Sequence, residues 1–410
     1  FYRALSRILR IFVTYLISDP DDAYTASRAC LEKHYLYNLA KPWLGNGLLT
    51  ADVATWKVHR KVINLAFTQQ MLNGLLVTFN AHSRRLLELL DENIGKSFDP
   101  EPLLLDTNLK IICETSIAVD PTEHKEIFDE YVKSIREMCD IIFQRFIKYW
   151  FHSDYIFSFS DLKRKQDVVV KGLHKLSDTM LIIISDNFTP LMDTILEMSL
   201  EKGLLTDRQI REHLDTILFG GHDTSMTSLT CTLALLGSDQ KRQDKVFQEI
   251  TEVMGNSLRD VDKDDLPKLT YLECVIKESL RLYPIAAFFP RVTPTDLKLK
   301  NYTLPSGSTC VIDSWGIHRH PVWGPDAEEF RPERWLEPET LPDVHQVYGA
   351  FGVGRRTCIG KSYAMMSMKV FLVHMLRRYK VTADISKLTL MVDLLLRPHS
   401  GRDIKIELRK

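Results

Sequence analysis

Apolar residues recur at every third or fourth position over long stretches of the chain, which is the spacing of one face of an α-helix. This period is nearly continuous from 69 to 201, where two amphipathic helices are expected over 127–149 and 162–185. The segments at 154–161 and 187–190 are the expected connections after these two helices. The pattern therefore predicts a mainly α-helical protein.

The best defined of the predicted helices begins after Thr206, where Gln209 completes a capping box. Its apolar stripe continues to Leu236, so we expect a core helix of roughly 30 residues, or ~45 Å at the usual rise. Two further helices are expected over 269–283 and 361–379.

Short β-branched or apolar runs, closed by Gly, Pro or Asp, predict a few strands near both ends of the chain. A helix over 21–37 and a basic helix that opens at 54–61 follow the first strand. The expected strands span 10–17, 291–299, 309–314, 388–396 and 402–408, with a turn at Gly401 between the last two. Small β-sheets should therefore accompany the helices, and the absence of repeats or low-complexity linkers predicts a single domain.

Composition narrows the class of protein. The chain has 410 residues, of which 45% are hydrophobic and 26% charged, with a net charge of −1, so nothing in it favours nucleic acid. Its seven cysteines are scattered and never spaced as C-x-x-C, which indicates a reduced compartment without disulfides or structural zinc. No apolar run is long enough to cross a membrane, and no signal peptide follows Phe1. We expect the chain to begin inside a domain.

One cysteine has an unusual setting. Cys358 lies between two glycines, follows Arg355 and Arg356, and precedes the helix predicted over 361–379. Positive charge and a helix N-terminus both lower the pKa of a thiol, so a thiolate is expected. The glycines permit close approach of a large group. From these residues alone, Cys358 is either a thiolate beneath a bulky group or a reactive nucleophile.

A polar segment interrupts the long core helix. Gly220, Gly221, Asp223 and Thr224 are poor residues for a helix interior, each a few tenths to ~1 kcal/mol worse than Ala. Such a segment can be a surface-facing turn or a kink without chemical role. Because the apolar stripe continues on both sides, we favour a buried site in which glycines admit a flat ligand and an acid beside a hydroxyl relays protons.

Two further pairs of residues are weak evidence of function when each is taken alone. Trp56 and Arg60 lie one turn apart on the basic helix, which by itself favours a solvated basic face with an interfacial Trp. Glu278 and Arg281 have the spacing of an intrahelical ion pair, and most such pairs lie on the surface.

Taken together and in chain order, these signals resemble the cytochrome P-450 superfamily, over essentially the whole chain. The cysteine motif F-x-x-G-x-R-x-C-x-G is met by Phe351, Gly354, Arg356, Cys358 and Gly360. The oxygen-activating helix motif is met by Gly220, Gly221, Asp223, Thr224 and Ser225. Three shorter motifs are also present: E-x-x-R at Glu278 and Arg281, P-E-R-F/W at Pro332 to Trp335, and W-x-x-x-R at Trp56 and Arg60. The chain looks most like the microsomal family-four clan. Members of that clan often carry a Glu that esterifies heme where this chain has Gly220, so non-covalent heme is expected and a fatty-acid ω-hydroxylase role is in doubt.

The resemblance implies a fold, a reaction and partners. The fold is a triangular, α-rich single domain with small β-sheets, spanning 1–410 and lacking an N-terminal anchor and the first β segment. The reaction inserts one oxygen atom from O₂ into a lipophilic substrate (a fatty acid, sterol, terpenoid or xenobiotic) with NADPH-derived electrons. The implied partners are NADPH–cytochrome P-450 reductase and cytochrome b5, at the cytoplasmic face of the endoplasmic reticulum membrane.

The resemblance also assigns roles to residues. Cys358 is the implied axial ligand of the iron of heme b. Asp223 and Thr224 are the implied proton-delivery pair. The remaining cofactor-binding residues are Trp56, Arg60, Arg291 and Arg356, which meet the propionates, together with Gly221, Phe351 and Gly360. His59 and Arg355 are expected to be solvated, and Glu278, Arg281 and Arg334 to form a buried structural cluster.

Three other functions stay open at this point. A heme-thiolate isomerase or dehydratase would need neither NADPH nor O₂, and a non-catalytic heme sensor or carrier would show no turnover with reductase. Outside the family, Cys358 could act as a nucleophile with one of the thirteen histidines, although no arrangement of His with Asn or Asp stands out.

Overall fold

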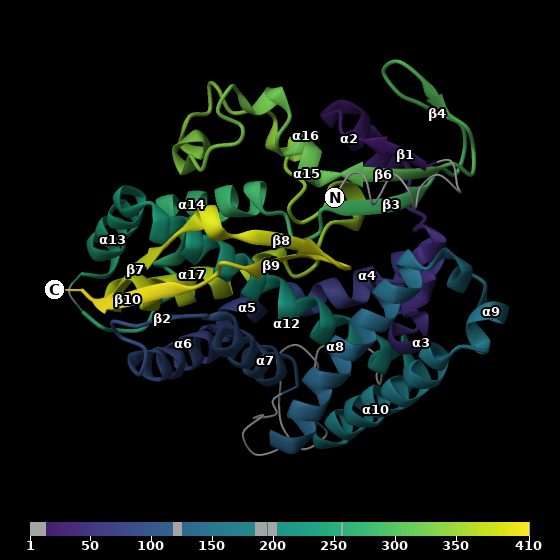
Figure 1. Cartoon of the computed structure of the whole chain (residues 1–410), viewed down its shortest axis with the longest axis horizontal. Coiled ribbons are helices and arrows are strands. Elements are labelled where there is room, and N and C mark those ends of the chain that lie inside the picture. The colour runs from purple at the N-terminus through teal and green to yellow at the C-terminus, as the bar shows by residue number, and fades with distance from the viewer. Residues whose placement is uncertain (1–13, 118–124, 185–194, 196–202, 256, 410) are drawn as a thin grey trace.

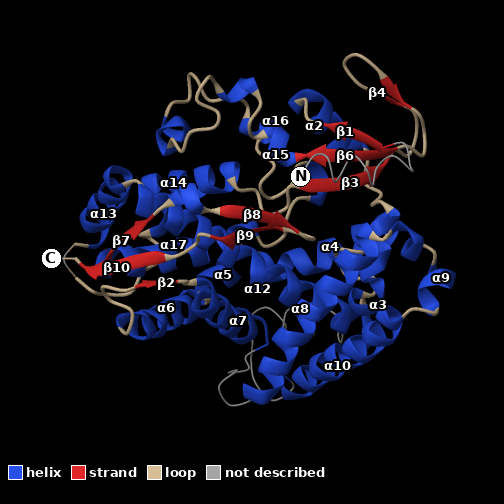
Figure 2. Cartoon of the chain, viewed as in Figure 1, coloured by secondary structure: helices blue, strands red, loops and turns tan. Residues whose placement is uncertain are grey.

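Helices dominate the part of the chain that the structure describes, as the apolar period predicts (Figure 2). The computed structural model describes residues 14–117, 125–184, 195, 203–255 and 257–409. The α-helices are α2 (Pro20–Ala29), α3 (Lys41–Leu44), α4 (Val53–Ile63), α5 (Gln69–Gly74), α6 (Leu76–Asp91), α7 (Glu101–Ile117), α8 (Lys125–Ile147), α9 (Asp154–Ser158), α10 (Asp161–Ile184), α12 (Asp207–Ser238), α13 (Gln240–Met254), α14 (Thr270–Leu282), α15 (Ser314–Ile317), α16 (Val344–Val347) and α17 (Lys361–Arg378). Short 3₁₀ helices that bear on the site are η2 (Tyr35–Ala40), η4 (Tyr149–His152), η7 (Pro332–Leu336) and η8 (Gly354–Arg356).

The strands form small, separate sheets at the periphery of the helices (Figure 1). In the first sheet β1 runs parallel to β6 and β3 runs antiparallel to it, and in the second β10 pairs with β2 and β7. Two antiparallel hairpins, β4–β5 and β8–β9, complete the set. The strands are β1 (Thr14–Ile17), β2 (Ser97–Phe98), β3 (Phe288–Val292), β4 (Leu297–Lys298), β5 (Thr303–Leu304), β6 (Thr309–Asp313), β7 (Tyr379–Ala383), β8 (Thr389–Val392), β9 (Leu396–Ser400) and β10 (Ile404–Leu408).

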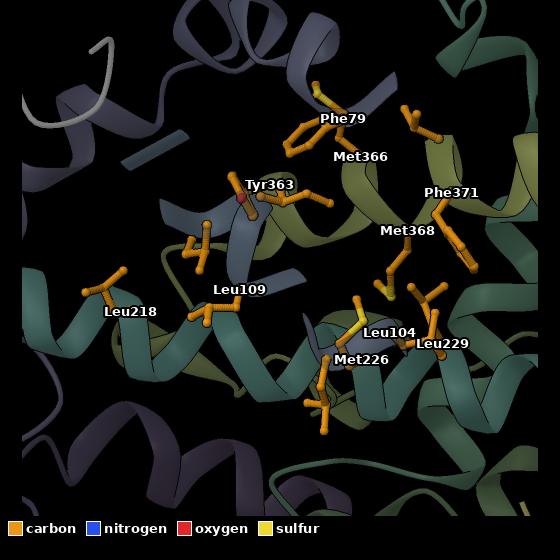
Figure 3. Packing of buried hydrophobic residues seen from close by; sticks show 14 of the residues in the cluster. Phe79, Leu104, Leu109, Leu218, Met226, Leu229, Tyr363, Met366, Met368 and Phe371 are labelled. Carbon is orange, nitrogen blue, oxygen red and sulfur yellow. The ribbon is translucent and has the colours of Figure 1, made fainter. Parts of the chain in front are cut away.

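The core is built around α12, which crosses the middle of the molecule (Figure 1). Thr206 and Gln209 form the predicted capping box at its start. Apolar side chains of α7, α12 and α17 meet in one cluster, in which Figure 3 shows Leu104, Met226 and Met368. The long helix therefore presents its polar segment from inside the core.

Most of the predicted helices are confirmed within a few residues, as α8, α10, α12, α14 and α17 show. The helix predicted over 21–37 is too long, because α2 ends at Ala29 and Lys33 then forms an isolated bridge with Arg291. The connection predicted at 154–161 contains α9. The connection predicted at 187–190 lies outside the described residues.

Two of the predicted strands are wrong in extent. The segment 388–396 folds back into the β8–β9 hairpin, because the Asp393 carboxylate accepts a hydrogen bond from the backbone N–H of Leu395, at 2.9 Å, and closes a turn. The segment 291–299 is divided between β3 and β4. Of the first predicted strand, only the part from Thr14 lies within the described residues.

The expected buried charge cluster is confirmed. Glu278 and Arg281 of α14 are fully buried and form two hydrogen bonds of 2.9 Å, and Arg334 of η7 donates to the same carboxylate at 2.8 Å. The indole of Trp335 and the backbone N–H of Arg331 also donate to it, each at 3.0 Å. A buried carboxylate needs such complete pairing, so this cluster fixes η7 against α14.

All seven cysteines are free, and Cys358 alone of them is accessible. No helix in the described part of the chain combines the length and hydropathy that a membrane crossing requires.

Candidate functional site

Cys358 lies in a loop that glycines shape. Its backbone N–H donates to the carbonyl of Phe351 at 2.8 Å and closes the loop between η8 and α17. Gly354 has φ +77°, and a Cβ there would stand 2.7 Å from the carbonyl oxygen of Ser27. Only glycine fits this position, so the loop lies close against the end of α2. Gly360 is the N-cap residue of α17.

The thiol of Cys358 is accessible and is also surrounded by protein atoms. Its side chain is accessible, yet burial among protein atoms is the main cause that raises the pKa of this thiol. The N–H of Gly360 and the charges of Arg60 and Lys361 lower the pKa by less than burial raises it. The expected depression of the pKa is therefore wrong for the chain alone, and a cation on the sulfur is needed to stabilise the thiolate.

Cations from distant elements gather near this loop. Arg60 of α4 donates to the carbonyl of Thr357 at 2.9 Å, and its charge acts on Cys358. Arg356 donates to the carbonyls of Leu31 and Ala51, each at 3.2 Å, and lies over the ring of the buried Trp56, 4.3 Å from its centroid. The hydrogen bonds and the ring fix both guanidinium groups in place.

Two more cations complete the group, and one of them is absent from the sequence predictions. Arg291 of β3 is buried and lies beside Lys33 through their backbone bridge. Burial, followed by the charges of Arg291 and Arg356, holds the pKa of Lys33 well below its usual value. No local signal singles out Lys33, because the bridge to Arg291 joins residues far apart in the chain.

The four cations lack anions. Among the described residues, no carboxylate lies within ion-pair distance of Lys33, Arg60, Arg291 or Arg356. One terminal nitrogen of Arg356 is buried without a hydrogen-bond partner, and burial lowers the pKa of this side chain to about 10. Buried donors of this kind are matched by a partner in native proteins. The arrangement therefore fits a ligand that carries carboxylates, beside a sulfur ligand for a metal.

The two glycines of α12 have different surroundings. Gly220 is exposed although it lies in the middle of a core helix, and a Cβ there would meet nothing within 4 Å. A Cβ on Gly221 would stand 2.6 Å from the Cδ1 atom of Ile112 of α7. The close approach that Gly221 permits is therefore to α7, and Gly220 is the glycine that faces open space. A role for Gly221 in cofactor binding stays a prediction.

Asp223 and Thr224 are neighbours with different partners. The hydroxyl of Thr224 donates to the carbonyl of Gly220 at 2.8 Å. The buried Asp223 forms an ion pair of 2.8 Å with Arg397 of β9, without the angles of a hydrogen bond. Burial raises the pKa of Asp223 and the charge of Arg397 opposes this rise. Sequence patterns gave no sign of Arg397, which directly follows the strand predicted over 388–396.

The two residues expected to be solvated differ. Arg355 is exposed as expected. His59 is buried, and its Nδ1 lies 2.9 Å from Nε2 of His213 of α12, so the expectation for it is wrong. This contact holds α4, which carries Trp56 and Arg60, against α12.

Comparisons with known proteins agree on one family. The family model described as Cytochrome P-450 matches residues 21–405, which include every candidate site residue. Cytochrome P-450 4V2 of Rattus norvegicus is 33% identical over 407 residues, which cover 92% of this chain and 77% of the relative. Cytochrome P-450 4c3 of Drosophila melanogaster is 30% identical over 411 residues, which cover 93% of this chain and 77% of the relative.

Proposed function

The chain belongs to the cytochrome P-450 family, in its family-four clan, and is a heme-thiolate monooxygenase that binds heme b; from this premise we propose that Cys358 is the ligand of the iron. The observation that carries the proposal is the position of Cys358 beside Arg60, within a group of cations that lack carboxylate partners. A thiolate ligand lets the bound heme favour O–O cleavage.

The four cations are the proposed partners of the two heme propionates. Arg60, Arg291 and Arg356 each present a guanidinium group, and carboxylates form strong charge-assisted hydrogen bonds with such groups. Trp56 holds Arg356 in place by its ring, while Phe351 and Gly360 shape the loop around the sulfur. The heme is bound without an ester bond from α12, because position 220 has no side chain.

Asp223 and Thr224 are the proposed residues for proton delivery. The Thr224 hydroxyl donates its hydrogen to the carbonyl of Gly220, which faces open space. The hydroxyl oxygen can therefore accept a hydrogen bond from another donor. Burial brings the pKa of Asp223 upward, which makes transfer of a proton from this carboxyl easier near neutral pH.

The substrate and the electron source are proposed on the same basis. We expect a lipophilic substrate (a fatty acid, sterol, terpenoid or xenobiotic) and electrons from NADPH through NADPH–cytochrome P-450 reductase or cytochrome b5. The exposed cations Arg355 and Lys361 flank the cysteine loop and suit an acidic partner surface. A difference-spectrum screen of those four compound classes identifies the substrate class by the compound that shifts the heme spectrum.

A surface patch supports placement at a membrane, and we propose the cytoplasmic face of the endoplasmic reticulum. We call it the aromatic patch: the exposed residues Ile147, Tyr149, Trp150, Tyr155, Ile156 and Phe159, on the end of α8, η4 and α9. Trp and Tyr concentrate at membrane–water interfaces, and the neighbouring Lys148 adds a positive charge.

The reduced, CO-bound spectrum tests the central proposal. The wild type should show the Soret band expected of a thiolate–CO complex, and Cys358→Ser should lose it. Cys274→Ala, which removes a buried thiol elsewhere, should keep it. A Cys358→Ser protein with an unchanged band would contradict the assignment. A requirement for NADPH and O₂ in turnover then separates the monooxygenase from a hydroperoxide isomerase or a heme carrier.

A further inference from the structure

The seam between α7 and α12 contains an amide that contacts the oxygen-activating segment. Asn108 of α7 is buried, and its side-chain nitrogen lies 2.6 Å from the carbonyl oxygen of Gly221 and 2.5 Å from that of His222. Both bonds lie directly before Asp223 and Thr224. The carbonyls are acceptors only, so the amide must present its nitrogen to them, and its oxygen is left buried without a partner.

Other contacts along the same face of α7 keep this amide in place. Ile112, one turn after Asn108, packs where Gly221 has no side chain. The ring of the buried His222 lies near the backbone of Leu105, about one turn before Asn108. Figure 3 shows Leu104 and Leu109 of α7 in the core beside α12. The helices are thus packed without room for Asn108 to turn away.

Side-chain donors cover a continuous run of carbonyls on α12. Those of Gly220, Asp223 and Thr224 accept hydrogen bonds from the hydroxyls of Thr224, Thr227 and Ser228, within the same helix. The two carbonyls between them, of Gly221 and His222, accept from Asn108 instead. Hydroxyls that bond back to the preceding turn loosen and bend a helix. Asn108 is the donor that ties this loosened turn to a neighbouring helix.

We propose that Asn108 is a positioning residue for proton delivery: by donating to the carbonyls of Gly221 and His222, it fixes the turn of α12 from which Asp223 and Thr224 project. This inference rests on the proposed roles of Asp223 and Thr224. Without the amide, the two carbonyls lose their fixed direction and the turn opens more often. More of the O₂ consumed is then released as hydrogen peroxide, formed with two NADPH-derived electrons and two protons, instead of giving one oxygen atom to the substrate.

Asn80 offers a matched control. It is also a buried amide, and its nitrogen likewise donates to two carbonyls, those of Leu76 and Val261, at 2.8 and 2.9 Å. It lies on α6, away from the polar segment of α12. Asn80→Leu removes these two bonds without touching that segment. It also removes the two bonds that the Asn80 oxygen accepts, from the backbone N–H of Val261 at 2.9 Å and from Nε2 of His374 at 2.7 Å, so its loss of stability is an upper reference for Asn108→Leu.

Hydrogen exchange of the heme-loaded protein is the first test. An α-helix pairs the amides of Ser225 and Met226 with the carbonyls of Gly221 and His222. In Asn108→Leu these amides should exchange about tenfold faster, as expected for the loss of two hydrogen bonds. In Asn80→Leu they should exchange as in the wild type, and α17 should be unchanged in Asn108→Leu. Unchanged exchange of Ser225 and Met226 in Asn108→Leu overturns the proposal.

The fate of electrons is the second test. With reductase, NADPH and the compound selected by the spectral screen, the share of electrons recovered as hydrogen peroxide should rise in Asn108→Leu and stay at the wild-type level in Asn80→Leu. Equal peroxide in the two variants would show that Asn108 only supports packing.

Thr224→Ala, measured alongside, tests the proposed function separately. Unchanged peroxide in Thr224→Ala overturns the role of Thr224, whereas unchanged hydrogen exchange in Asn108→Leu overturns that of Asn108. If Asn108→Leu does not accumulate with heme, Asn108→Ser is measured instead. Its hydroxyl is shorter than the amide and can donate to at most one carbonyl, and the same exchange and peroxide results then decide the proposal.

Discussion

At the scale of single residues, the proton-delivery pair depends on groups that only the fold brings to it. Asp223 pairs with Arg397 from the β8–β9 hairpin, and the hydroxyl of Thr224 is held by its own helix. The first contact sets the charge of the carboxyl and the second sets the direction of the hydroxyl. Each therefore affects a different measurable property of turnover.

Replacement of Thr224 by Ala should leave the reduced-CO spectrum unchanged, because the hydroxyl that is lost bonds within its own helix and does not touch the cysteine loop's hydrogen bonds. Turnover with the compound selected by the spectral screen should instead release more hydrogen peroxide for each NADPH oxidised. Thr230→Ala, which removes a buried hydroxyl bonded to the carbonyl of Met226 at 3.0 Å, is the control. Equal peroxide yields from the two variants would refute the role of Thr224.

Arg397→Met should shift the acidic side of the rate–pH profile. Burial raises the pKa of Asp223 and the charge of Arg397 lowers it, so loss of Arg397 raises this pKa further. A carboxyl that stays protonated cannot take up the next proton, and turnover should then fall at a higher pH than in the wild type. Product formation measured across pH gives the shift. Arg402→Met, which breaks an ion pair with Asp99, should leave the profile in place.

The candidate site could be predicted only where its members carry a motif. Glycine and charge around Cys358 mark it locally, whereas Arg356 and Arg60 were assigned only through the family motifs that they match. Lys33 and Arg397 were missed, since their partners are more than 150 positions away and their local sequences are ordinary. The pKa of Cys358 was predicted with the wrong sign, because sequence shows nearby charge but not the degree of burial.

At the scale of elements, the packing of α7 against α12 surrounds the adjacent glycines of α12 differently. Gly220 faces open space, and Gly221 faces Ile112. In an exposed helix interior glycine is about 0.5–1 kcal/mol less favourable than alanine. Glycine at position 220 therefore lowers the stability of the helix, whereas position 221 is glycine because no side chain fits.

Alanine at these two positions should change stability in opposite directions. Gly220→Ala should raise the free energy of unfolding by about 0.5–1 kcal/mol. Gly221→Ala places a methyl group 2.6 Å from Ile112 and should lower it by about 1–3 kcal/mol through overpacking. Urea denaturation of the heme-loaded proteins measures both. The double variant Gly221→Ala/Ile112→Val should recover part of the loss, and equal destabilisation of the two single variants would refute this account of the seam.

Long helices were predictable from sequence, and short strands were not. Repeated apolar positions and a capping box define α12 over many residues. The β8–β9 turn depends on one side chain, Asp393, within a run of apolar residues that reads as a continuous strand. The end of α2 likewise has no local signal, because the chain leaves the helix to let Lys33 bridge to Arg291. Where such turns form and where such helices end depends on contacts with residues far away in the chain.

At the scale of the whole molecule, the aromatic patch lies at the periphery, around α9 in Figure 1. Ring contacts connect it to the interior: Trp150 packs edge-on against Phe151, which packs against the buried Phe157. Tyr155 and Phe159 pack against each other and are 76% and 70% exposed, so the patch keeps large apolar surfaces in water. A surface of this kind is suited to the interface of a bilayer.

Vesicle binding tests this surface. The chain should bind vesicles of phosphatidylcholine with phosphatidylserine, and Tyr155→Ser/Phe159→Ser should weaken partitioning by about tenfold, which corresponds to ~1.4 kcal/mol. Val77→Ser/Leu258→Ser removes two equally exposed apolar residues outside the patch and should have little effect. Co-sedimentation gives the bound fraction. Equal binding by the two double variants would argue against the patch as a membrane surface.

The buried carboxylate of Glu278 imposes an order on synthesis and folding. Chains leave the ribosome N-terminus first, so Glu278 and Arg281 emerge well before Arg334, which lies 56 residues after Glu278. Until Arg334 arrives, burial of Glu278 would leave part of its charge unpaired, at a cost of several kcal/mol. That face of α14 therefore stays hydrated during translation. The cysteine loop and α17 emerge later still, so the two halves of the heme site close together only after α17 has left the ribosome.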